Sequence, residues 1–209
     1  MRLSYLKHKN LTFAYLYRLK NLKKINLFIY ICIFSCVIVA CSKNVDGELL
    51  LSRVVSKQLG DQLKSKLVDT LQSEGPISAI SVCNIDAVKI STAISIRNDL
   101  KVGRTSLKIR NPANQPDAWE TKQLMWFSSQ VESSSDLKSL EIHEVVAENN
   151  KEVFRYMKAI PMQEPCILCH GSTLAPSVKE SIKNLYPHDQ ATGFEIGQIR
   201  GAFTVKINL

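Results

Sequence analysis

The stretch Cys166-Ile167-Leu168-Cys169-His170 constrains the fold and the chemistry of this 209-residue chain more than any other. The spacing C-x-x-C-H is typical of covalent haem attachment. Two thiols must reach the two vinyl groups on one edge of a porphyrin while the adjacent imidazole faces the iron, so the stretch must form about one turn of helix. The motif therefore predicts one covalently bound haem c, attached at Cys166 and Cys169, with His170 as the proximal iron ligand.

Export of the chain is predicted from residues 1–40. This segment holds seven basic residues and no acidic residue, and its apolar run over 25–40 is interrupted only by Asn26 and Ser35. As a helix that run is about 24 Å long, which is shorter than the ~30 Å hydrocarbon core of a membrane. A basic head before a short apolar run is typical of a secretory signal.

The end of that run, Ile38-Val39-Ala40-Cys41, resembles a bacterial lipobox. It predicts a lipoprotein-type signal peptide over 1–40, a lipid on Cys41 and a lipidated tether over 41–48. An uncleaved signal anchor, with Cys41 incidental, is the alternative. In either case we expect the rest of the chain to lie on the periplasmic side of a bacterial membrane, and Ser42 favours the outer membrane.

The net charge of +8 arises mainly in the same segment. The whole chain has 27 Lys and Arg against 19 Asp and Glu, and removing the seven basic residues of 1–40 leaves 20 against 19, or about +1. Nucleic-acid binding depends on neutralising many phosphates, so nucleic acid is excluded as a partner. With 45% hydrophobic and 22% charged residues, the chain is neither disordered nor a polytopic membrane protein.

Three alternatives to haem exist for the cysteine motif: a zinc half-site, a redox dithiol and a disulfide. Zinc requires four ligands, and no second cysteine pair follows residue 41. A thioredoxin-like dithiol is expected in a βαβ setting, which this sequence does not show. Export favours haem, because c-type attachment takes place outside the cytoplasm.

The distal iron ligand stays open on the residues alone, since six side chains are candidates: Met125, Met157, Met162, His143, His188 and Cys83. The first two methionines are typical gap-fillers of a core, and Met162 is expected on the proximal side or at the haem edge. Both histidines are expected to be exposed. Cys83 lies on the apolar face of a predicted helix, where composition favours the plain role of a small core residue.

Hydrophobic periodicity predicts a single α+β domain. Apolar residues at three- to five-residue spacing predict a first helix over 47–73, and a break at Gly75-Pro76 separates it from a second helix over 76–95. Two shorter helices are predicted over 117–130 and 177–185. Strands are predicted over 106–110, 140–147, 152–161 and the last ten residues, the middle two as a hairpin. Helices that flank a small antiparallel sheet define the α+β class.

Six stretches resemble, in order, one family of PAS-like c-type haem domains, first described in a cyanobacterial soluble protein and found as extracytoplasmic sensors of bacterial signalling proteins. They are Ile80–Asn84, Gly103–Lys108, Arg110–Asn114, Pro116–Glu120, Pro165–Gly171 and Tyr186–Phe194. The resemblance covers 49–209. It implies a PAS-like antiparallel sheet with flanking helices, and a haem ligated by His170 on the proximal side and Cys83 on the distal side. His188 occupies a variable slot of the family.

The haem propionates need cations or amides, and the candidates are Arg104, Arg110 and Asn114. The alternative is that these residues only hold the loop over 103–119.

A cysteine thiolate on the iron favours the ferric state, so a low reduction potential is expected. With both axial positions filled, electron transfer or redox and small-ligand sensing is favoured, and no catalytic residue is predicted. The alternative is a haem enzyme of peroxidase or nitrogen-oxide chemistry, which requires an open distal site with a positioned His or Arg. A third reading is a PAS-like ligand-binding module without haem. The partner is an unknown redox or signalling protein, and a homodimer is left open.

Overall fold

The first half of the domain is helical, as its apolar spacing predicts. The computed structural model describes residues 44–134 and 136–209, so the predicted signal peptide and the first three residues of the predicted tether, Cys41 included, lie outside the described residues. Helix α2 (Asp46–Ser73) is continuous over 28 residues. Gly75 then adopts a φ of 86°, which favours glycine, and Pro76 opens α3 (Pro76–Ser81). The predicted break between the two helices is confirmed.

The second predicted helix is not one regular α-helix. Between α3 and α4 (Ala87–Asn98) the chain forms a π-helical turn, η1 (Val82–Asp86), in which the Ala87 N–H donates to the Val82 carbonyl. Such a turn inserts an extra residue, and π-turns occur frequently at functional sites. Cys83 lies within it. The prediction of a regular helix over 76–95 is therefore wrong at this point, and the helix also continues three residues further, to Asn98.

Four strands form one antiparallel sheet in the order β1-β4-β3-β2. They are β1 (Lys101–Thr105), β2 (Glu141–Glu148), β3 (Lys151–Pro161) and β4 (Ile199–Asn208). The predicted hairpin is confirmed. It turns at Asn149 and Asn150, both with positive φ, as two-residue hairpin turns require.

The strand predicted over 106–110 is wrong. The strand in this region is β1, which ends at Thr105, and Gly103 lies within it, opposite Thr204 of β4. Glycine is common in turns, which by itself would favour a turn at this position. Pairing with the terminal strand, about a hundred residues away, extends the segment instead.

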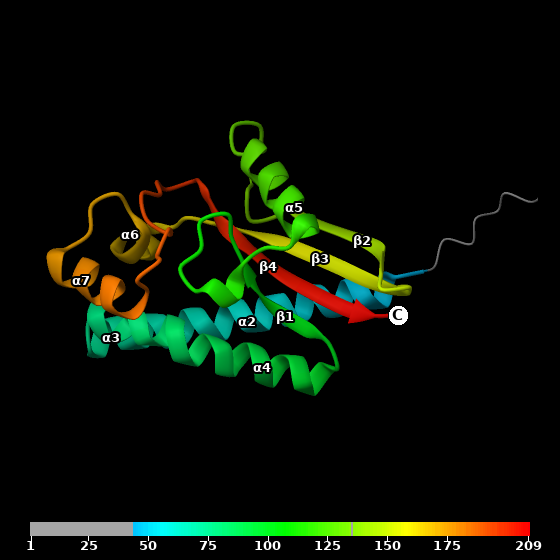
Figure 1. Cartoon of the computed structure of the whole chain (residues 1–209), viewed down its shortest axis with the longest axis horizontal. Helices are drawn as coiled ribbons and strands as arrows, with labels where there is room; N and C mark the ends of the chain where they lie inside the picture. Colours follow the sequence, from blue (N-terminus) through cyan, green and yellow to red (C-terminus); the bar gives the residue numbers. More distant parts are fainter. Residues whose placement is uncertain (1–43, 135) are drawn as a thin grey trace, which may run out of the picture. The chain divides into compact units, whose positions relative to one another are not determined.

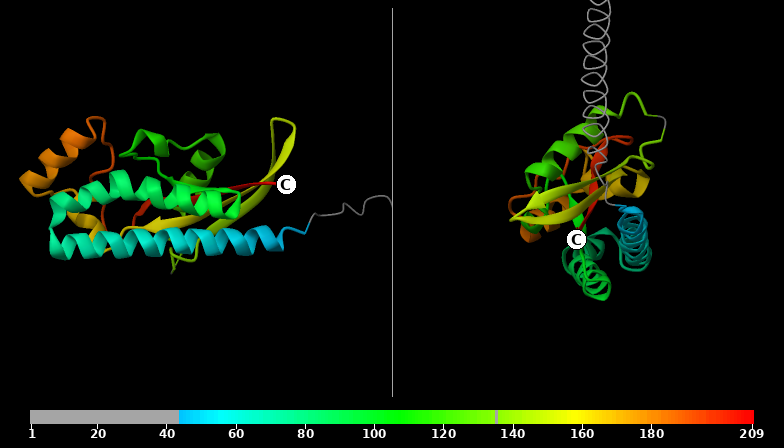
Figure 2. Two further views of the ribbon diagram at one scale, coloured as in Figure 1. Left: turned by 90° about the horizontal axis from the view of Figure 1, so that it is seen from below. Right: turned by 90° about the vertical axis from the view of Figure 1, so that its right-hand side faces the viewer.

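Helices cover both faces of the sheet (Figures 1 and 2). On β3, Phe154 and Tyr156 join a core with residues of α2 and α4, while Met157 and Ala159 join a second core with Leu124 and Phe127 of α5 (Ala118–Ser129). This alternation follows from the two-residue period of a strand. Because both faces are covered, β3 is buried along most of its length. The α+β class with an antiparallel sheet is confirmed.

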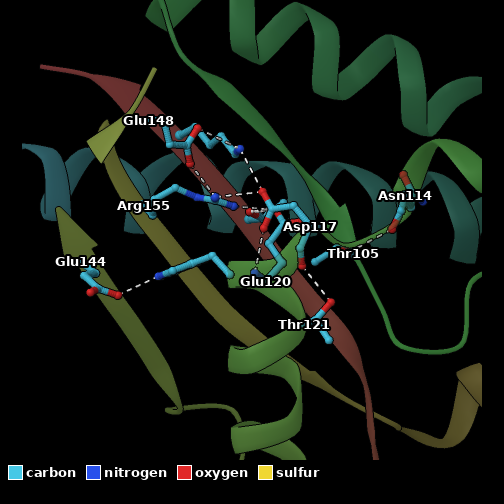
Figure 3. Close-up of polar contacts among 11 residues, drawn as sticks. Thr105, Asn114, Asp117, Glu120, Thr121, Glu144, Glu148 and Arg155 are labelled. Carbon is cyan, nitrogen blue, oxygen red and sulfur yellow. Dashed lines mark hydrogen bonds and ion pairs between the residues drawn. The ribbon is translucent and has the colours of Figure 1, made fainter. Parts of the chain in front are cut away.

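An ion network around a buried arginine fixes the start of α5 to the sheet (Figure 3). Arg155 of β3 is only 2% exposed, and its Nη1 lies 2.9 Å from Asp117 Oδ2 and 2.7 Å from Glu148 Oε1. Asp117 also forms a capping box with Glu120 at the start of α5. At the end of β1, the Thr105 hydroxyl donates to the Asn114 carbonyl at 3.1 Å. The loop after β1 is therefore held at both of its ends.

The cysteine motif lies at the end of the domain where α3 packs. There α6 (Glu164–His170) and α7 (Pro176–Leu185) lie beside α3 (Figure 1). Ile80 of α3 packs with Val178, Ile182 and Tyr186, and Cys169 lies against this cluster.

By length and composition, Pro76–Asn98 is the one helical stretch among the described residues that is apolar enough to cross a membrane. Its residues Ile80, Ala87 and Ile94 are buried in the cores of this domain.

Candidate functional site

One cavity gathers chemistry-bearing side chains from both halves of the domain. Its walls come from the end of α2, from α3 and η1, from β1 and the loop after it, from α6 and from the start of β4. The attachment cysteines, the two ligands implied by the family resemblance and the propionate candidates all line it: Cys166, Cys169, His170, Cys83, Arg104, Arg110 and Asn114. Cys83 and His170 are 87 positions apart along the chain, so only the tertiary fold brings them together.

The motif occupies one short helix. Helix α6 spans seven residues, opens with Pro165 in its first turn and ends at His170. Gly171 follows at once, and a Cβ at that position would lie 2.8 Å from the Ile167 carbonyl oxygen. The expected helical turn is present, and it places both thiols and the imidazole on the wall of one cavity.

The His170 imidazole is oriented by the backbone. Its Nδ1 lies 2.6 Å from the Ala191 carbonyl oxygen. A carbonyl can only accept, so Nδ1 carries the proton and the lone pair is on Nε2, which is the arrangement typical of metal-binding histidines. Burial, together with the nearby Arg200 and Arg110 guanidinium groups, lowers the pKa of His170 to about 2, and the ring is neutral at ordinary pH.

Arg110 fastens the loop after β1 to the segments around the motif. Its side chain is 8% exposed; Nε donates to Asp189 Oδ1 at 2.9 Å and Nη2 donates to the Cys169 carbonyl at 2.6 Å. Nη2 also lies 3.3 Å from the Ala191 carbonyl that binds His170. These contacts agree with the alternative of a loop-holding role for Arg110, and they occupy two of its three nitrogens.

The six candidate distal ligands are separated by position. Met125 is 61% exposed, Met157 is buried between the sheet and α5, and Met162 is buried beside Ala191 and Phe194, where Cys166 and Ile167 pack against it. His143 and His188 are both exposed, as expected. All six are among the described residues, and only Cys83 lines the cavity.

A family model described as Tll0287-like matches residues 41–208. The chain belongs to the Tll0287-like family. Among solved structures, the cyanobacterial haem protein Tll0287 is similar to it, with 27% sequence identity and a TM-score of 0.61 over 78% of this chain and 96% of that one. No curated protein sequence matches the chain significantly. The family resemblance stated from the sequence motifs is thus confirmed.

Sequence reasoning missed one cavity residue of this Tll0287-like domain, Arg200. With Arg104 and Arg110 it places three guanidinium groups on the cavity wall, whose lining includes no Asp or Glu. Burial and the two other arginines lower the pKa of Arg200 to about 10. Its Nε is buried and has no hydrogen-bond partner among the described residues. The lining therefore suits a ligand that carries negative charge. No local sequence pattern around residue 200 predicts that Arg200 lines the cavity.

Burial also affects the neutral groups of the cavity. It raises the pKa of the Cys169 thiol, and the nearby Cys83 and Cys166 raise it further, against the opposing effect of Arg110. It likewise raises the pKa of Tyr186 to about 12, with Cys83 again contributing. The cavity thus favours the neutral forms of the Cys169 thiol and the Tyr186 phenol.

The alternative of a zinc half-site has no support in the geometry. Over residues 44–134 and 136–209, no group of three or more His, Cys, Asp or Glu side chains is arranged to hold a metal ion.

Proposed function

We propose that this protein is an exported, membrane-anchored c-type cytochrome with one haem, which acts in electron transfer or in sensing of redox state or a small ligand. The observation that carries the proposal is the single cavity shared by Cys83, the two motif thiols and His170. The haem-protein description of the similar cyanobacterial structure supports it.

The residues present fit a covalent haem. Cys166 and Cys169 would each add across a vinyl group, with the thiol hydrogen passing to the vinyl carbon, so the attachment needs no oxidant. His170 offers Nε2 to the iron from one side, and Cys83 offers sulfur from η1. The apolar lining, Leu67, Leu71, Ile80, Ile109 and Ile160, suits a flat ring, and Arg104, Arg110 and Asn114 are the proposed propionate contacts.

The bound haem supplies an iron that changes between the ferric and ferrous states. The protein around the iron determines its reduction potential. A Cys83 thiolate stabilises the ferric state by its negative charge, which lowers the reduction potential. If Cys83 and His170 both held the iron, no position on it would remain open for a substrate. We therefore favour a carrier or sensor over a catalyst.

The remaining parts of the proposal concern segments and assemblies beyond the cavity. We propose cleavage of the signal peptide after residue 40, a lipid on Cys41 and a location on the periplasmic side of a membrane, with the outer membrane favoured. The PAS-like relationship of the sheet, a redox or signalling partner protein and a homodimer are parts of the same proposal.

The test compares optical and EPR spectra of the wild type, Cys83→Ser and Met162→Leu, each expressed with the c-type assembly machinery. Met162→Leu is the matched control, because Met162 is 2% exposed and lies near the motif but does not line the cavity. We expect low-spin thiolate-ligated ferric haem in the wild type and in Met162→Leu. Cys83→Ser should lose that signature, and its reduction potential should rise by more than ~59 mV, a tenfold change in the redox equilibrium.

Two results would contradict the proposal. If denaturing extraction removes the haem from the wild type, attachment through Cys166 and Cys169 is wrong. An unchanged Cys83→Ser spectrum would remove Cys83 as the distal ligand.

A further inference from the structure

Arg200 is directed into the cavity by an irregularity of the sheet. Along the β3–β4 ladder, Gly201 pairs with Ile160 and Ile199 pairs with Pro161, so Arg200 has no residue opposite it. An extra residue of this kind is a β-bulge, and bulges near functional sites re-aim a side chain. Arg200 accordingly lines the cavity, although the apolar side chains of the same strand pack on the two cores.

One side of the Arg200 guanidinium is held firmly by the protein. Its Nη1 donates to the Ser106 hydroxyl at 2.9 Å and to the Lys108 carbonyl at 3.1 Å. The plane lies over the Phe194 ring at 5.2 Å, and that ring in turn meets the His170 imidazole edge-on at 6.4 Å between centroids. Arg200 is therefore positioned on the same side of the cavity as the proximal histidine.

The other side of the guanidinium is unsatisfied. Its Nε is buried and has no hydrogen-bond partner within the described part of the chain. A buried N–H without an acceptor is unfavourable, and a buried charge requires a partner. Arg110, by contrast, already has Asp189 and two carbonyls as partners. The two largest electrostatic effects on Arg200 come from groups of the same sign, Arg110 and Arg104, and the smaller effects of Asp189 and Cys83 oppose them.

We propose that Arg200 binds a carboxylate of the bound cofactor through its Nε–H, on the His170 side of the cavity, and that its positive charge raises the reduction potential of the iron. The inference rests on the proposed haem function and adds a cofactor contact to it. Carboxylates are the groups that a guanidinium recognises with paired, charge-assisted hydrogen bonds. The positive charge of Arg200 thus partly offsets the lowering of the iron's reduction potential by a Cys83 thiolate.

The test measures the midpoint potential of the holoprotein in the wild type, Arg200→Gln, Arg200→Lys and Arg97→Gln. Arg97 is an exposed arginine of α4 that does not line the cavity, so its variant controls for loss of one surface charge. We expect Arg200→Gln to shift the redox equilibrium at least tenfold toward the ferric state, which corresponds to a midpoint potential about 59 mV lower. Arg200→Lys keeps the charge and should recover most of that shift, while Arg97→Gln should match the wild type.

Infrared difference spectra between the two redox states provide the second readout. Carboxylate bands of the wild type should shift in Arg200→Lys, because lysine lacks the Nε–H of arginine. If Arg200→Gln yields no holoprotein, Arg200→Lys tests the contact between Arg200 and the carboxylate. Unchanged carboxylate bands, or an equal fall of potential in the Lys and Gln variants, would overturn the inference. Those results would leave haem attachment in the wild type intact, whereas a wild type without covalent haem would refute the proposed function itself.

Discussion

The ion pair between Arg110 and Asp189 offers the sharpest test of how the fold supports the cavity. Arg110 Nε lies 2.9 Å from Asp189 Oδ1, and the two side chains are 8% and 9% exposed. Nη2 lies 3.2 Å from the other carboxylate oxygen, so the contact is bidentate. The Ala191 N–H also donates to Asp189 Oδ1 at 3.0 Å. Asp189→Asn keeps the volume of the side chain but removes its charge, and it leaves Arg110 as a buried cation.

The expected loss follows from this burial. Removing one partner of a buried ion pair costs about 3–5 kcal/mol, because the remaining charge stays desolvated. For a domain of this size each kcal/mol lowers the melting temperature by about 2–4 °C. Asp189→Asn should therefore lower the melting temperature of the protein by about 6–20 °C.

The assay is denaturant and thermal unfolding of the wild type, Asp189→Asn, Arg110→Met and the double variant. Asp61→Asn serves as the matched control, because Asp61 pairs with Lys57 on the surface, with side chains 64% and 77% exposed. Exposed pairs are worth at most about 1 kcal/mol. The double variant should recover part of the loss, since it removes both charges. If Asp189→Asn costs no more than Asp61→Asn, the role assigned to this buried pair is wrong.

Two further outcomes are expected. Gly201→Ala should lower the unfolding free energy by about 1–3 kcal/mol, since the new Cβ would overlap the Thr105 carbonyl oxygen. Gly103→Ala is the control and should cost clearly less, because the nearest atom to its Cβ is Thr204 Cγ2 at 4.0 Å. Equal losses in the two variants would contradict the close approach of Gly201 to Thr105. Burial alone would raise the pKa of Asp117, but the Glu120 N–H, Arg155 and Lys206 outweigh it and hold that pKa at about 2, below the ordinary 3.8. The stability from this carboxylate is therefore fully present above about pH 4 and is lost as the pH falls toward 2. Acid unfolding of Asp117→Asn should show a shallower decline over that interval, and a decline as steep as that of the wild type would count against the assignment.

Much of the fold followed from patterns within single segments. The break at Gly75-Pro76 and the hairpin at Asn149-Asn150 were predicted because their conformations depend on local backbone preferences. The helix predicted from residue 117 is present as α5, and Asp117 caps it. The errors occur where tertiary contacts override such preferences. β1 forms around Gly103 because β4 pairs with it, and η1 interrupts a segment whose residues favour a regular helix.

The features of the candidate site also divide into those that follow from single segments of sequence and those that depend on tertiary contacts. The motif Cys166–His170 and the low charge of the chain after residue 40 could be determined from the sequence alone, because spacing within one helical turn and a count of charges need no long-range contact. The family resemblance implied Cys83 as the distal ligand, and the tertiary structure adds that Cys83 alone of the six candidates shares a cavity with His170. The tertiary structure also showed that Arg110 is engaged by Asp189, and it brought Arg200 into the cavity through a bulge in strand register. Register and cavity walls are set by residues far apart in the chain, and no single segment of sequence encodes them.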